Sequence, residues 1–96
     1  MDRAEFEASL RQEGYEIRDG EIEPHRHREA HAHDFDARIL VLEGSITLAF
    51  GTERVTYLPG DSCSVPARTM HEEHTEADGG RYVSGRRTPQ AASATR

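Results

Sequence analysis

The sequence predicts an all-β barrel or sandwich that follows one short helix. Short apolar segments recur along most of the chain, and turn residues separate them roughly every eight to twelve residues. Helical spacing of apolar residues precedes Gly14, and from Tyr15 the period changes to that of strands. The 96 residues, 34% of them hydrophobic, suffice for one domain with a modest core. We therefore expect a helix over 1–14, a single barrel over 15–85 and a mobile tail over 86–96.

The helix is expected over residues 2–13. Asp2 can cap its first turn, with Glu5 three residues later as in a capping box. Phe6 and Leu10 lie four residues apart, which places them on one face. Gly14 then ends the helix.

The strongest strand signal is the apolar run over 38–42, whose two apolar faces predict a strand covered on both sides. Tyr15 and Ile17 alternate with charged residues, and Asp19-Gly20 is expected to turn the chain. Further strands are expected at 46–50, 54–57, 62–65, 71–75 and 81–84.

Charge and composition exclude several functions. Asp and Glu outnumber Arg by 18 to 12, so the chain lacks the excess of positive charge that nucleic-acid binding needs. The absence of lysine excludes lysine-based Schiff-base chemistry. A single cysteine, Cys63, cannot form an internal disulfide, and no apolar run is long enough to span a membrane. We expect a cytoplasmic protein, and the small core favours a homodimer.

Histidines are concentrated in two places. Four of the six lie within residues 25–33, and His71 and His74 follow near the end. In a strand, His31 and His33 would project from the same face, where both imidazoles could reach one metal ion. Nitrogen ligands suit iron, nickel, copper and zinc alike. The alternative is a surface histidine tract that binds metal only adventitiously.

The chain from about residue 20 to 84 resembles the cupin superfamily. The first cupin motif is His-x-His, three or four residues, Glu, six residues and Gly. The second is Gly, five residues, Pro, one residue, Gly, two residues, His, three residues and Asn. The positions that match are His31, His33 and Gly44 in the first motif and Gly60, Pro66 and His71 in the second.

Three positions depart from these motifs. Ala37 occupies the Glu position, Arg68 the second Gly position and Thr75 the Asn position. The first departure leaves a fourth metal ligand unassigned. Asp36 is one residue away and would need a local bulge to face inward, and Asp34 is the next possibility. Either carboxylate could instead orient a histidine or lie in solvent.

The resemblance implies a small antiparallel jelly-roll barrel that holds one divalent transition-metal ion (Fe, Mn, Ni, Cu or Zn) at His31, His33 and His71. It also implies a metal-dependent enzyme, an oxidoreductase such as a dioxygenase or an isomerase, with a small organic molecule as substrate. Small cupins commonly pair, which again favours a homodimer. Two alternatives stay open: a non-catalytic module that binds a small ligand or senses metal, and a purely structural metal site.

Three further side chains are candidates for catalysis. Glu73 shares strand parity with His71 and could supply a base. Arg38, like Arg81, could hold an anionic substrate, although surface ion pairing is the simpler interpretation. Tyr57 is a candidate that is most simply explained as part of the barrel wall.

The remaining histidines and the cysteine are expected to lie outside the site. His25 and His27 fit the first motif less well and are expected in a loop near the barrel mouth. His74 follows His71 by three residues and should face the opposite way, at the surface or an interface. Cys63 shares parity with an apolar neighbour, which favours core packing.

Overall fold

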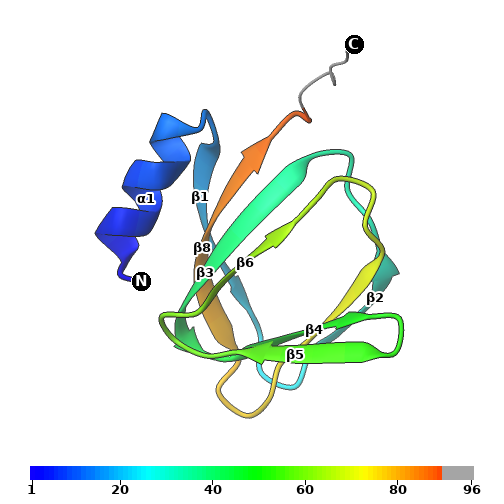
Figure 1. The fold of residues 1–96 in the computed structure, drawn as a ribbon. Helices are drawn as coiled ribbons and strands as arrows, with labels where there is room; N and C mark the ends of the chain where they lie inside the picture. Colours follow the sequence, from blue (N-terminus) through cyan, green and yellow to red (C-terminus); the bar gives the residue numbers. More distant parts are fainter. Residues whose placement is uncertain (90–96) are drawn as a thin grey trace.

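The computed structural model describes residues 1–89, which form a jelly-roll barrel of two four-stranded antiparallel sheets with one helix outside (Figure 1). One sheet has the strand order β1–β8–β3–β6 and the other the order β2–β7–β4–β5. The predicted fold class is therefore confirmed. The elements are α1 (Arg3–Gln12), β1 (Glu16–Ile22), β2 (His27–His31), β3 (Asp36–Gly44), β4 (Ile46–Phe50), β5 (Glu53–Tyr57), β6 (Ser62–Val65), β7 (His71–His74) and β8 (Gly80–Arg87).

The main core lies between the two sheets, where inward side chains of both meet. Strand β3 carries apolar residues on both faces because both are covered, as its sequence predicted. Val41 points into the barrel, whereas Leu40 points outward and is 1% exposed beneath the helix. The buried residues of the core between the sheets are Ile22, Val41, Ile46, Leu48 and Val65.

Helix α1 lies against the outer side of the sheet that contains β1, β8 and β3 (Figure 1). Its Phe6 and Leu10 are fully buried and pack on Leu40 and Val83. The predicted capping box is present, since Glu5 N donates to the Asp2 carboxylate while the Glu5 side chain accepts from Asp2 N. Among residues 1–89, no helix has the length and apolar character needed to cross a membrane.

Two glycines lie where another segment of the chain comes too close for a side chain. The prediction of a turn at Asp19-Gly20 is wrong. Strand β1 continues through Gly20, which pairs with Tyr82 of β8. A Cβ on Gly20 would lie 2.5 Å from the Tyr82 ring, so the missing side chain makes room for that ring. Gly44 does mark a crossing from one sheet to the other. It has φ +72, and a Cβ there would lie 2.1 Å from Gly79 O.

The last strand extends beyond its expected end. The mobile tail was expected to begin at residue 86, but Arg86 pairs with Glu16 and with Ala37, and Arg87 pairs with Asp36. The reason is that neighbours on both sides, β1 and β3, continue the sheet to this point. The part of the expected tail from residue 90 onward lies outside the described residues.

Candidate metal centre

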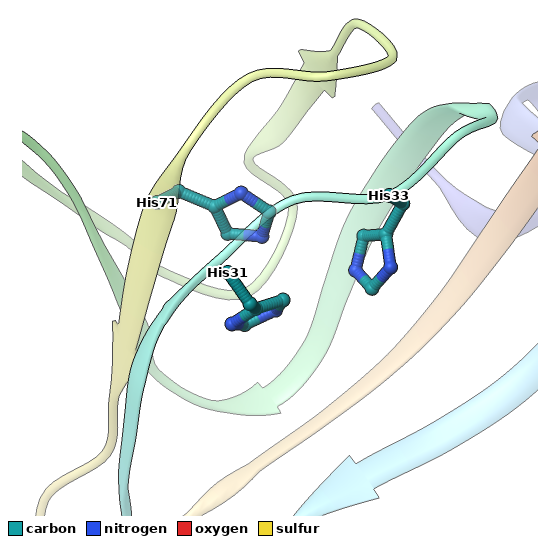
Figure 2. A group of neighbouring side chains, drawn as sticks. All are labelled: His31, His33 and His71. Carbon is teal, nitrogen blue, oxygen red and sulfur yellow. The ribbon is translucent and has the colours of Figure 1, made fainter.

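Three histidine side chains meet inside the barrel. His31 is the last residue of β2, His33 lies in the connection to β3, and His71 begins β7. One ring nitrogen of each lies within 4.8 Å of the others. The ring centroids of His31 and His71 are 4.4 Å apart, and that of His33 is 5.0 Å from His31 and 5.6 Å from His71. Figure 2 shows the three rings gathered around a common space.

An irregularity in strand pairing brings His31 to this space. Strands β2 and β7 pair His27 with His74 and Arg28 with Glu73, so regular pairing would place Ala30 opposite His71. The register shifts after Arg28, and His31 takes that place instead. One extra residue in a strand moves the following side chains to the other face of the sheet. The shift therefore turns His31 into the barrel.

Backbone carbonyls orient two of the three rings. His31 Nδ1 donates to Glu29 O at 2.8 Å, and His71 Nδ1 donates to Thr69 O at 2.9 Å. A carbonyl can only accept, so Nδ1 carries the proton in the neutral ring and Nε2 keeps a free lone pair. This arrangement is typical of metal-binding histidines, in which the second nitrogen is held by an acceptor.

His33 is adapted to the neutral state by its surroundings. Burial, and then the neighbouring imidazoles of His31 and His71, lower the pKa of His33 from its ordinary value, against an opposing effect of Glu73. A neutral imidazole is the form that binds metal. The pKa shift thus favours the ligand form of His33 near neutral pH.

A carboxylate lies beside two of the histidines. Glu73 Oε2 is 3.5 Å from His31 Nε2 and 3.4 Å from His71 Nε2. Its other oxygen, Oε1, accepts a hydrogen bond from Arg28 Nη1 at 3.1 Å. Glu73 is only 9% exposed, and this hydrogen bond gives a buried polar group the partner that it needs. The site therefore combines three nitrogen donors with one adjacent carboxylate.

The histidines line a cavity of about 110 Å³. Arg86 also lines it and places its guanidinium 4.7 Å from the centroid of the Phe35 ring. Sequence reasoning missed Arg28, Phe35 and Arg86. The alternation of Tyr82, Ser84 and Arg86 along β8, all of which line the cavity, is the signal that could have identified Arg86.

Comparison with known families identifies this architecture. The model of the Cupin domain family matches residues 18–82, which include both histidine motifs. The chain belongs to the cupin family. No curated protein matches it in a comparison of sequences.

Solved structures of similar fold support the assignment. A cupin-2 domain containing protein from Shewanella frigidimarina has a TM-score of 0.64 at 22% identity, over 76% of this cupin and 71% of that chain. A Rhizobium leguminosarum protein of unknown function has a TM-score of 0.73 at 20% identity, over 78% and 71%. The polyketide cyclase RemF from Streptomyces resistomycificus has a TM-score of 0.66 at 22% identity, over 75% of this cupin and 54% of that chain. At these identities the likeness concerns the fold.

The departures from the cupin motifs have structural explanations. Ala37, at the glutamate position, lines the cavity and leaves space in it. Arg68, at the glycine position, has φ +62, a backbone conformation that glycine adopts more readily. Its N–H donates to His33 O at 2.7 Å and so ties the two motifs together. Thr75, at the asparagine position, is buried and donates its hydroxyl to Glu23 O.

The carboxylates expected near Ala37 do not take the glutamate's place. Asp36 Oδ1 accepts a hydrogen bond from Ala67 N at 2.8 Å, and Asp36 is not part of the histidine group. The bulge that would have turned it inward is in β2 and not at this point of β3. Asp34 does not line the histidine cavity either.

Two of the three catalytic candidates lie away from the cavity. Arg38 points outward to the helix, where Nη1 contacts Ser9 Oγ at 3.0 Å and Glu13 Oε1 at 3.1 Å. Tyr57 packs against the main core beside Cys63, and neither lines the cavity. Burial raises the pKa of Cys63 to about 11, as expected for a packed thiol. Of the three, only Glu73 lies in the site.

The other histidines take different positions. His25 lies in the turn before β2 with φ +54, close to its expected place. His27 was expected in a loop but is the first residue of β2, because it pairs with His74. His74 faces away from the cavity, as parity predicted, and its ring stacks on that of His27.

Proposed function

We propose that this cupin holds one divalent transition-metal ion at His31, His33 and His71 and acts as an enzyme on a small organic molecule. The observation that carries the proposal is the convergence of three imidazole nitrogens beside the Glu73 carboxylate in a cavity of about 110 Å³. The donor set fits iron, manganese, nickel, copper or zinc. Two of the rings already have Nε2 as the free nitrogen.

The residues of the proposed site have different roles. The three histidines hold the ion, which when bound supplies Lewis-acid chemistry, or oxygen chemistry if it is iron. The carboxylate of Glu73 lies 3.5 Å from His31 Nε2 and 3.4 Å from His71 Nε2, where it would serve as a fourth ligand or accept a proton from the substrate. Arg28 orients Glu73 through its ion pair. These roles support an oxidoreductase or isomerase activity.

The cavity favours a small organic anion as substrate. Arg86 lines the same cavity as the histidines and, within residues 1–89, forms no ion pair. A guanidinium can bind a carboxylate through two parallel hydrogen bonds. The polyketide cyclase of similar fold is an example of an enzyme built on this architecture. We infer that Arg86 binds the carboxylate of the substrate.

The first experiment is elemental analysis of protein purified without a histidine tag and dialysed against metal-free buffer. We expect close to one ion per chain in the wild type and almost none in the His31→Ala/His71→Ala variant. His25→Ala is the matched control, since His25 does not belong to this group of three histidines. Absence of metal from the reconstituted wild type, or equal loss in the control, would overturn the proposal.

Thermal unfolding of the loaded and metal-free protein separates a functional site from a structural one. A structural ion should raise the melting temperature by many degrees, because its binding free energy is then folding free energy. An open functional site should change it less. Homodimer formation and a cytoplasmic location stay predictions from the sequence, and sedimentation equilibrium tests the first.

A further inference from the structure

The outer face of the β2–β7 pair carries a second group of potential ligands. Side chains alternate along β7, so His71 and Glu73 point into the barrel while Glu72 and His74 point outward. His27 lies directly opposite His74 on β2. The sequence His-Glu-Glu-His therefore supplies each face of the sheet with one histidine and one carboxylate.

The three outward side chains are in contact. Glu72 Oε1 lies 2.9 Å from His27 Nε2 and 3.4 Å from His74 Nε2. One ligand atom from each of the three lies within 4.8 Å of the others. The two imidazole rings stack with their centroids 4.3 Å apart. Two imidazoles and a carboxylate form a donor set that divalent transition metals bind.

A second observation points to a missing ligand at the same place. His74 Nε2 is buried and makes no hydrogen bond with the described residues, although Glu72 lies nearby. A buried polar atom without a partner is destabilising, and most such atoms in folded proteins are satisfied. A metal ion between Glu72 and the two rings would satisfy this nitrogen.

We propose that His27, Glu72 and His74 form a second site for a divalent transition-metal ion on the outer face of the barrel. This ion links edge strand β2 to β7 and so supports the pairing that also positions His31 and His71. Zinc, nickel or copper suits the two imidazoles. The side chains of His27 and Glu72 are 51% and 38% exposed, so they are held less firmly than the ligands inside the barrel. We therefore expect weaker binding than at the inner site.

The test is calorimetric titration of the metal-free full-length protein with zinc. The wild type should bind two ions per chain with different affinities, and only the tighter one should survive dialysis against metal-free buffer. His27→Ala and Glu72→Gln, which change partly exposed side chains, should each lose the weaker ion and keep the stronger one. His31→Ala/His71→Ala should show the reverse. The outer site therefore succeeds or fails independently of the inner one.

Two further measurements test whether zinc binds specifically to the outer site. His25→Ala removes a nearby histidine outside the group and should leave both ions in place. If it lowers the weaker affinity as much as His27→Ala does, zinc binds adventitiously to surface histidines and the proposal is wrong. Nitrogen NMR of the wild type should show zinc-dependent shifts at the ring nitrogens of His27 and His74. A wild type that binds one ion, or unchanged binding in both outer variants, would also overturn it.

Discussion

The inner and outer faces of the β2–β7 pair carry the same kinds of side chain in different surroundings. Inside, His71 is 3% exposed and a carbonyl orients its ring. Outside, the His27 side chain is 51% exposed, and its Nε2 contacts the Glu72 carboxylate while its ring stacks on that of His74. The comparison shows that the residue types alone do not make a good metal site. Burial and acceptors that orient the rings decide how well the donors are prearranged.

The largest effect is expected when the charge of one of the two adjacent glutamates is removed. Glu73→Gln should lower the zinc affinity of the inner site about 10–100-fold, the range measured when groups that support metal ligands are changed. The reason is that the negative charge beside His31 and His71 is lost while Arg28 keeps its positive charge. Competition with a chromophoric chelator measures the affinity. Glu72→Gln is the control and should leave the inner affinity unchanged.

An equal loss from Glu72→Gln and Glu73→Gln would show that the two faces are not independent. It would mean that strand pairing, and not the local carboxylate, controls both affinities. A loss confined to Glu73→Gln would support the assignment of Glu73 as the carboxylate of the inner site.

A smaller effect concerns protonation inside the barrel. In the metal-free protein, the His33 ring should titrate with a midpoint below its ordinary pKa of 6.5, because burial and two neighbouring imidazoles disfavour the charged form. The unfolded chain then binds protons at a higher pH than the folded one. Stability should therefore fall as the pH drops below 6.5 towards the folded pKa. Proton NMR measures the midpoint, and a value above 6.5 would contradict the burial argument.

The smallest effect on metal binding should come from the helix. Asp2→Ala removes the helix cap and should lower the free energy of unfolding by about 1 kcal/mol, as measured by urea denaturation. Helix α1 packs on the other sheet, so neither zinc affinity should change. A changed affinity would mean that the helix transmits strain to the β2–β7 pair.

The sequence was most informative where local rules apply. The capping box at Asp2 and Glu5 and the burial of Phe6 and Leu10 follow from spacing within one helix. The opposite orientations of His71 and His74 follow from strand parity. The same parity predicted that Glu73 faces the same way as His71, and Glu73 does line the cavity.

Predictions failed where a position depends on a distant segment. Gly20 resembles a turn residue, but its role is to make room for Tyr82 of the paired strand. Asp36 is near the motif's glutamate position in sequence, yet its carboxylate binds Ala67 N across the β3–β6 pair. Arg86 was assigned to the tail, but it belongs to β8 because β1 and β3 both pair with that strand as far as this residue.

The family, the helix, most of the strands and the group of three histidines could be predicted from the order of residues. Which carboxylate and which arginines lie beside those histidines became clear only in the folded chain. The physical reason is register. A shift of one residue in β2 decides whether His31 faces the cavity or the surface, and that shift depends on pairing with β7, some forty residues away along the chain. Local spacing cannot specify such a contact, because it forms only when the two strands pair.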